Sequence, residues 1–200
     1  MWQLEGRALV IASHNAGKAR EVADLFRPLV GALRFASELG LPEPVEDGAT
    51  FVENATIKAR AAAAATGELA VSDDSGLVVF ALDGAPGVHA KRWGGGDYER
   101  AMRRVHEALG DRDRAAEMVC ALVIAAPDGS TWSAEGRVRG QLTWPPRGQL
   151  GFGYEPMFVP EGETRTYGEM ERDEKHRDDP RARAFRALRL RAHFPEAIGK

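Results

Sequence analysis

The chain has little cysteine and almost no excess of either charge. Its 200 residues include one cysteine, Cys120, so no disulfide can form within the chain. Cys120 lies in the apolar run 118–126, where we expect a reduced core residue rather than a nucleophile. The formal net charge is −3, without the basic excess that usually accompanies strong attraction to nucleic acid. We therefore expect no nucleic-acid partner.

Long apolar runs are missing as well. The run 59–65 is interrupted by Arg60 and, like the run 118–126, is far too short to span a bilayer, so we expect no membrane partner. Residues 1–5 lack the basic region and apolar core of a signal peptide, and we expect a cytoplasmic protein. Hydrophobic residues make up 44% of the chain and charged residues 28%, which is ordinary for a globular protein. With neither an internal repeat nor a long linker, residues 1–200 are expected to form one domain.

Segments with strand and helix signals alternate along the chain. Residues 7–12 are predicted to form a buried strand, because apolar residues follow one another without polar alternation. A capping box of Thr50 and Glu53 predicts the start of a later helix, on which Asn54 and Lys58 share a face. A hairpin of residues 118–142 follows further on. The pattern predicts an α/β fold with a mixed central β-sheet flanked by helices.

The segment 72–76, Ser-Asp-Asp-Ser-Gly, stands between two apolar runs that resemble strands. Adjacent carboxylates repel unless a cation takes them up, so Asp73 and Asp74 near buried strands favour a divalent metal site. A turn is the alternative interpretation, since Asp, Ser and Gly commonly form turns. These residues alone leave the two interpretations even.

The polar segment 13–18 joins the first predicted strand to a helix. Free backbone N–H groups at a helix start, with the positive end of the helix dipole and Lys18 beside them, suit a phosphate group. The segment is not a Walker A loop, because Ala12 and Ala19 stand where that pattern has Gly and Ser or Thr. A capped helix with a solvated lysine is an equally good interpretation.

A glycine-rich segment, 151–156, carries two aromatic residues. Phe152 and Tyr154 offer flat faces suited to stacking on a base, while the glycines allow tight turns. A place in the core is the alternative interpretation for Phe152.

Taken together and in this order, four segments resemble the inosine triphosphate pyrophosphatase family: 13–18, 51–59, 73–77 running on to 84–87, and 151–154. The similarity extends from about residue 7 to about residue 192. The resemblance implies a subunit of two α/β lobes with the active cleft between them, a homodimer, and a divalent cation, usually Mg²⁺. The implied substrate is a nucleoside triphosphate, with ITP, dITP and XTP hydrolysed to the monophosphate and pyrophosphate.

The resemblance also implies roles for individual residues. Asp74 would be the catalytic base, and Lys18 would stabilise the leaving pyrophosphate. Glu46 and Asp74 would hold the metal, with Asp73 as a further candidate ligand. The substrate-binding residues would be Ser13, His14, Asn15, Ala16, Gly17, Lys18, Lys58, Ser75, Phe152, Gly153, Tyr154, Glu155, Lys175 and Arg181. Among these, Phe152 would stack on the purine and Tyr154 would line the same pocket.

The chain departs from the family pattern at two places. Glu155 stands where the family usually has Asp. A His-Arg pair normally follows the tail lysine, but counting from Lys175 this chain has Pro180 and Arg181 there. Arg181 can still donate to a purine 6-keto oxygen, so these departures bear on base selectivity.

Two other functions remain as hypotheses at this point. One is a related nucleotide pyrophosphatase with a different base preference. The other is a non-catalytic nucleotide- or RNA-binding protein that uses the basic loop 91–96 and the arginines near the C-terminus. The acidic balance of the chain and the Asp73–Asp74 pair stand against this second hypothesis, because carboxylates without a metal repel phosphate.

Overall fold

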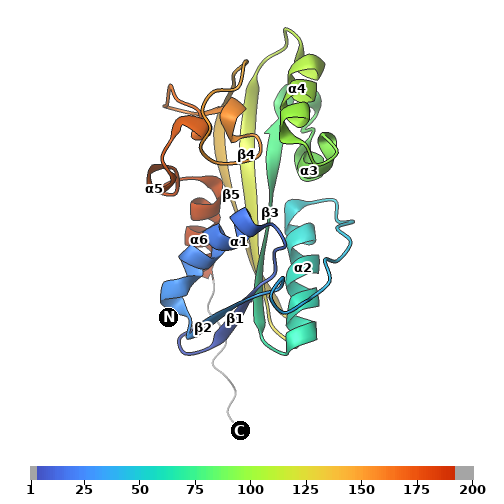
Figure 1. Ribbon diagram of the computed structural model, residues 1–200, viewed down its shortest axis with the longest axis vertical. Helices are drawn as coiled ribbons and strands as arrows, with labels where there is room; N and C mark the ends of the chain where they lie inside the picture. The colour runs from blue at the N-terminus through green and yellow to red at the C-terminus, as the bar shows by residue number, and fades with distance from the viewer. Residues whose placement is uncertain (1–3, 192–200) are drawn as a thin grey trace. The chain divides into compact units, whose positions relative to one another are not determined.

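The computed structural model describes residues 4–191 (Figure 1). Within these residues the chain forms two compact units. Unit 1 comprises residues 4–74, 121–135 and 184–191, and unit 2 comprises residues 75–120 and 136–183. The six strands form one mixed sheet in the order β2-β1-β3-β4-β5-β6. The predicted α/β fold with a mixed sheet flanked by helices is confirmed.

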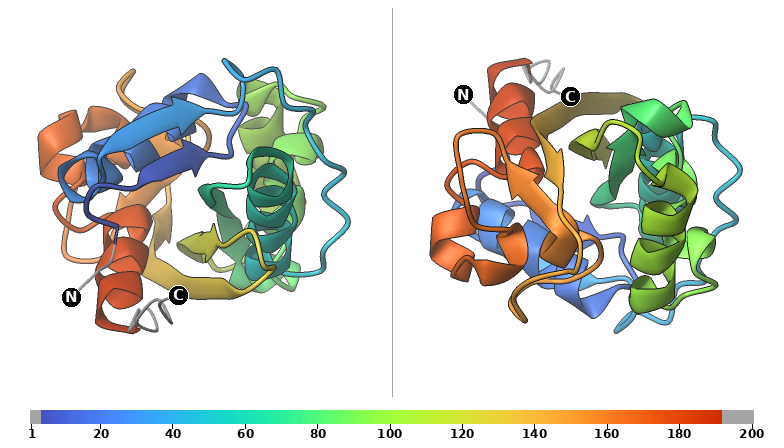
Figure 2. Two further views of the ribbon diagram at one scale, coloured as in Figure 1. Left: turned by 90° about the horizontal axis from the view of Figure 1, so that it is seen from below. Right: turned by 90° about the horizontal axis from the view of Figure 1, so that it is seen from above.

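Unit 1 is built on parallel strands. β1 (Ala8–Ile11) pairs in parallel with β2 (Ala32–Phe35) on one side and with β3 (Leu69–Val79) on the other. The connections are α1 (Ala16–Phe26) and α2 (Phe51–Thr66). Because parallel crossovers are right-handed and these two run in opposite directions across β1, the helices fall on opposite faces of the strand. Figures 1 and 2 show α1 on one side of β1 and α2 on the other.

Local signals in the sequence account for where these helices begin and end. Asn15 caps α1, and the predicted capping box of Thr50 and Glu53 starts α2. Gly67, with φ 69°, ends α2 in the left-handed conformation that favours glycine. The ring of Phe26 on α1 meets that of Phe185 edge to face at 5.1 Å.

Unit 2 holds the remaining elements and a core of its own. Its helices are α3 (Ala90–Trp93), α4 (Tyr98–Leu109), α5 (Arg172–Lys175) and the start of α6 (Pro180–Arg191). Its strands are β6 (Phe158–Pro160) and parts of β3, β4 (Ala115–Ala125) and β5 (Thr131–Leu142). β5 and β6 pair antiparallel. Large buried side chains of this core are Leu77, Met102, Val105, Leu109, Leu142, Met157 and Phe158.

Two expectations from the sequence are wrong. Residues 72–76 do not lie between two strands and form no turn, because the single strand β3 runs through them. Residues 91–96 are not a loop throughout, since Lys91, Arg92 and Trp93 belong to α3. The guanidinium of Arg104 lies 4.4 Å from the centre of the Trp93 ring, which gives this short helix a packing partner on α4.

None of the helices within residues 4–191 combines the length and the apolar character needed to cross a membrane. Cys120 is a buried free thiol, as predicted.

Candidate functional site

The predicted site residues fall into two sets, one in each unit. The unit 1 set comprises Ser13, His14, Asn15, Ala16, Gly17, Lys18, Glu46, Lys58, Asp73 and Asp74. The unit 2 set comprises Ser75, Phe152, Gly153, Tyr154, Glu155, Lys175 and Arg181.

The segment 13–18 leads from β1 into α1, as predicted. The side-chain oxygen of Asn15 accepts hydrogen bonds from the backbone N–H groups of Gly17 at 3.0 Å and Lys18 at 3.1 Å. The side chain of Asn15 therefore caps the N-terminus of α1. Lys18, however, is not a solvated lysine, because its ammonium group lies 4.0 Å from Oδ2 of the buried Asp73. The segment thus presents a helix start and a mostly buried cation together.

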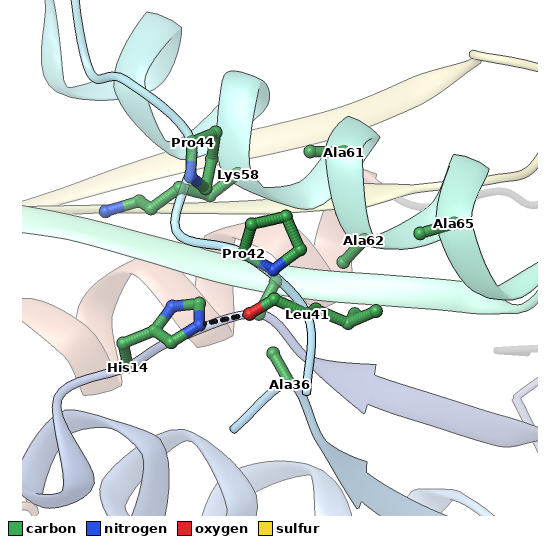
Figure 3. Close-up of a pocket in the computed structure, with 10 residues that line it drawn as sticks. His14, Ala36, Leu41, Pro42, Pro44, Lys58, Ala61, Ala62 and Ala65 are labelled. Atoms are coloured by element: carbon green, nitrogen blue, oxygen red, sulfur yellow. Dashed lines mark hydrogen bonds between the residues drawn. The ribbon is translucent and has the colours of Figure 1, made fainter. Parts of the chain in front are cut away.

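His14 points towards the loop of residues 41–48, which we call the acidic loop because it carries Glu43, Glu46 and Asp47. Its Nε2 lies 2.8 Å from the backbone oxygen of Leu41 (Figure 3). Since a carbonyl only accepts, the imidazole donates this bond. The two residues border a small cavity of about 60 Å³ whose other lining residues are Ala12, Ala36, Pro42, Pro44, Lys58, Ala61, Ala62 and Ala65. This hydrogen bond therefore fixes the His14 side chain to the acidic loop.

Two lysines face three carboxylates in unit 1. The ammonium group of Lys58 lies 2.9 Å from Oε1 of Glu46 and 3.7 Å from Oδ1 of Asp74. Lys18 faces Asp73 from α1. Burial raises the pKa of the Asp74 carboxyl; Lys58 and Lys18 oppose the shift, while the carboxylates of Glu46 and Asp73 add to it. The Asp74 carboxyl, which can accept a proton, therefore lies near two cations, the ammonium groups of Lys58 and Lys18.

Asn54 belongs to the same group, although the sequence did not single it out as a site residue. Its side chain is fully buried, donates through Nδ2 to Oδ2 of Asp74 at 3.4 Å, and accepts from the backbone N–H of Gly48 at 2.9 Å. Two signals in the sequence included it: Asn54 lies in the segment 51–59 that carries part of the family resemblance, and it stands four residues before Lys58 and so shares a face of the helix.

The unit 1 carboxylates have the chemistry that Mg²⁺ prefers. Within residues 4–191, no three His, Cys, Asp or Glu side chains are gathered so that they could hold a metal ion by themselves. Mg²⁺ is usually held by one or two carboxylates together with substrate phosphates rather than by an all-protein cage. Glu46 and Asp74 supply hard oxygen donors that already share one cation, the Lys58 ammonium. This donor set fits a Mg²⁺ that is bound together with a polyphosphate.

Four residues of the unit 2 set, Ser75, Phe152, Glu155 and Arg181, line a second hollow, whereas Gly153, Tyr154 and Lys175 are not among its lining residues. Its lining residues are Ser75, Met118, Val119, Cys120, Phe152, Glu155, Tyr167, Asp179, Pro180 and Arg181. Two aromatic residues, a serine, two carboxyl residues and an arginine therefore border one small space, and such a mixture suits a flat, polar-edged ligand.

Glu155 organises the aromatic side of this hollow. Its Oε1 accepts from the Lys175 ammonium at 2.8 Å, and its Oε2 accepts from the backbone N–H of Phe152 at 2.9 Å. Both charged side chains of this pair are more than nine-tenths buried. The same lysine lies 5.7 Å from the centre of the Phe152 ring. Glu155 thus fixes the loop that presents the ring.

Tyr154 lies in the core of unit 2 and is not among the residues that line the hollow. Its hydroxyl donates to the backbone oxygen of Ala90 at 2.9 Å, and its ring meets that of Tyr98 edge to face at 5.7 Å. Burial raises the pKa of the Tyr154 hydroxyl. Tyr154 therefore supports the glycine-rich segment from behind, while Phe152 borders the hollow.

The tail residues reach the hollow through the start of α6. Asp179 accepts from the backbone N–H of Ala182 at 2.8 Å and so caps the helix, with Pro180 at its first position. Arg181 is buried and lines the hollow. His176 is not a lining residue; its Nε2 lies 3.8 Å from Oδ2 of Asp179.

Comparison with known proteins gives consistent results. A dITP/XTP pyrophosphatase of Rhodospirillum centenum is 53% identical over 193 residues, covering 93% of this chain and 95% of that protein. One from Gluconobacter oxydans is 51% identical over 186 residues, covering 92% and 89%.

Solved structures of similar fold point to the same group of proteins as these relatives. A HAM1 protein from Coxiella burnetii superposes with a TM-score of 0.83 at 35% identity, covering 92% of this chain and 97% of that one. A nucleoside-triphosphatase, dITP/XTP pyrophosphatase from Mycobacterium abscessus superposes with a TM-score of 0.74 at 37% identity, covering 92% and 96%. The model of the Ham1 family matches residues 9–191, which confirms the resemblance drawn from the four sequence segments. The chain belongs to the Ham1 family.

Proposed function

We propose that this protein hydrolyses non-standard purine nucleoside triphosphates, namely ITP, dITP and XTP, to the nucleoside monophosphate and pyrophosphate, and so cleanses the nucleotide pool. The observation that carries the proposal is the meeting of two lysines, Lys18 on α1 and Lys58 on α2, with three carboxylates. The names of two relatives, both dITP/XTP pyrophosphatases, support it.

The triphosphate is assigned to the unit 1 set. Its negative charge needs cations, and Lys18 and Lys58 supply them beside the positive end of the α1 dipole. Ser13 and Asn15 hold the loop: Oγ of Ser13 donates to the backbone oxygen of Asn15 at 3.5 Å, and Asn15 caps the helix. Ala16 and Gly17 contribute backbone at the same helix start, where small side chains leave room for an oxygen-rich ligand.

A divalent cation, Mg²⁺, is proposed as the cofactor. Glu46 and Asp74 would hold it, with Asp73 beside them. When bound, the ion would neutralise phosphate charge and polarise the P–O bonds.

The chemistry assigned to the chain's own residues is general base catalysis. Asp74 accepts a proton from the attacking water, whose oxygen bonds to the α-phosphorus as the bond from that phosphorus to the bridging oxygen breaks. Pyrophosphate leaves with that oxygen, and Lys18 stabilises its charge. The raised pKa of Asp74 suits a proton acceptor, because a stronger base takes a proton from water more readily.

The purine is assigned to the unit 2 hollow. Phe152 offers a ring for stacking, and Arg181 offers donors that match a 6-keto oxygen. Adenine carries a 6-amino group at this position, so two hydrogen-bond donors, the amino group and the Arg181 guanidinium, would face each other without an acceptor. Ser75 and Gly153 are assigned to the substrate contacts as well, and Lys175 and Glu155 hold Phe152 in place.

Pyrophosphate release from ITP, dITP, XTP, dUTP, ATP and GTP, each with Mg²⁺ and with a chelator, tests the proposal. We expect metal-dependent release from ITP, dITP and XTP. Release mainly from dUTP would point instead to a pyrophosphatase with another base preference. No release from any substrate, with steeply salt-dependent RNA binding, would favour a binding protein.

The homodimer is proposed from the family resemblance, whereas the single domain and the cytoplasmic location are proposed from the expectations drawn from the sequence. Residues 1–200 would act as a single pyrophosphatase domain in a homodimer, in the cytoplasm, where a free buried thiol such as that of Cys120 stays reduced. Light scattering at several concentrations measures the oligomeric state, and a mass of 21.7 kDa throughout would contradict the dimer.

A further inference from the structure

Asn54 joins two parts of unit 1 that carry carboxylates. On one side it meets the acidic loop at the backbone of Gly48, and on the other it meets Asp74 in β3. Asn54 itself stands in the first turn of α2 and is fully buried. A buried amide is costly unless both of its ends are hydrogen-bonded, and here both ends have partners.

The orientation of this amide follows from its partners. The backbone N–H of Gly48 can only donate, so the oxygen of Asn54 must face it. The NH₂ group is then left for Oδ2 of Asp74, while Oδ1 of the same carboxyl faces the Lys58 ammonium. The Asp74 carboxyl is therefore held by a different residue of α2 at each oxygen.

The end of the acidic loop lies too close to α2 for a larger residue. A Cβ atom at position 48 would come within 2.7 Å of Cβ of Glu53 and 2.8 Å of Oδ1 of Asn54. The next two backbone N–H groups, of Ala49 and Thr50, donate to Glu53 at 2.7 and 3.0 Å. These contacts fix the loop that carries Glu46 against the same helix turn that holds Asp74.

We propose that Asn54 is a positioning residue that sets the orientation of the Asp74 carboxyl and ties it to the acidic loop. The inference rests on the proposed function, in which Asp74 is the base and Glu46 a metal ligand. Asn54 acts through these carboxyls and has no part in binding the substrate itself. Its removal should therefore lower kcat and leave KM for the nucleotide nearly unchanged.

Asn54→Asp is the sharpest variant, because it keeps the size and an acceptor for Gly48 but turns a carboxylate towards Asp74. We expect kcat for ITP to fall by about 10- to 100-fold with KM changed by less than about threefold. Glu53→Ala is the matched control: it removes the acceptor for the N–H groups of Ala49 and Thr50, and so loosens the end of the acidic loop, while Asn54 keeps its bonds to Gly48 and Asp74. We expect it to raise the Mg²⁺ concentration needed for half-maximal rate and to lower kcat less than Asn54→Asp does.

A double variant that exchanges the two side chains, Asn54→Asp with Asp74→Asn, gives a readout independent of activity. It restores a carboxylate–amide pair, so its Tm should recover towards that of the wild type relative to Asn54→Asp alone, while hydrolysis stays lost. A wild type inactive on ITP, dITP and XTP would overturn the proposed function, and Tm would still decide on the pairing. The inference about Asn54 is overturned if the exchange gives no recovery of Tm, or if Asn54→Asp in an active protein keeps wild-type kcat.

Discussion

Replacement of Glu155 by Gln is expected to destabilise unit 2 far more than loss of an ordinary ion pair. The carboxyl of Glu155 and the ammonium of Lys175 lie 2.8 Å apart, and both side chains are more than nine-tenths buried. Removing one partner leaves the other charge buried without compensation, which typically costs about 3–5 kcal/mol. Solvent screening, which reduces surface pairs to about 0–1 kcal/mol, does not apply at this depth.

Gln is the right replacement because it keeps the length of Glu155 and an acceptor for the backbone N–H of Phe152. Urea unfolding followed by circular dichroism would measure the free energy of unfolding. Since small domains have about 5–15 kcal/mol in total, a loss of about 3 kcal/mol would leave the variant folded and measurable. In the same variant KM for ITP should rise, because Lys175 no longer has a fixed place over the Phe152 ring.

Lys175→Met and the double variant Glu155→Gln/Lys175→Met complete a cycle. If the cost comes from an uncompensated charge, the double variant should lose less than the sum of the single losses by about 2 kcal/mol. Single losses below about 1 kcal/mol, or strictly additive ones, would refute this account of the pair.

Three further predictions follow from the same contacts. Asp74→Asn should lower kcat by about 10²–10⁴-fold while calorimetry still detects ITP binding, and near wild-type activity would remove Asp74 as the base. Thr50→Ala removes the cap of α2 and should cost about 1 kcal/mol, seen as a Tm lower by about 2–4 °C; an unchanged Tm would contradict the capping role. Gly151→Ala, at φ 84°, would place Cβ against the carboxyl of Glu155, which is held by two hydrogen bonds. It should lower the free energy of unfolding more than Gly67→Ala does, because φ there is 69° but no atom lies within 4 Å of the added Cβ. Equal losses of unfolding free energy would mean that the Glu155 carboxyl moves aside at little cost.

Much of the fold could be predicted because its signals are local. The apolar run of β1, the capping box of α2 and the cap of α6 at Asp179 each depend on residues within a few positions of one another. β2 is different. It is a short strand in which Ala32 and Arg34 are exposed, so it has no continuous apolar signal, and it forms because β1 offers it a partner.

The segment 72–76 could not be placed from its own residues. Ser72, Asp73 and Asp74 are turn formers by type, but in β3 each finds a partner far away in the sequence. Ser72 donates to the backbone oxygen of Ala12 at 3.1 Å, and the two aspartates face lysines on α1 and α2. Tertiary pairing of this kind overrides local preference, and no residue within the segment predicts it.

The two departures from the family pattern meet at the unit 2 hollow. Glu155 is longer than the usual aspartate, yet Gly151 leaves space for its carboxyl, and the extra reach is used to hold both Lys175 and the backbone of Phe152. Pro180 replaces a histidine but suits the first position of α6, with Asp179 as the cap. The helix start is therefore intact, and Arg181 still lines the hollow. If base selectivity depends on this guanidinium alone, Arg181→Met should raise the relative rate on ATP more than any change at Pro180, because only the arginine distinguishes a keto oxygen from an amino group.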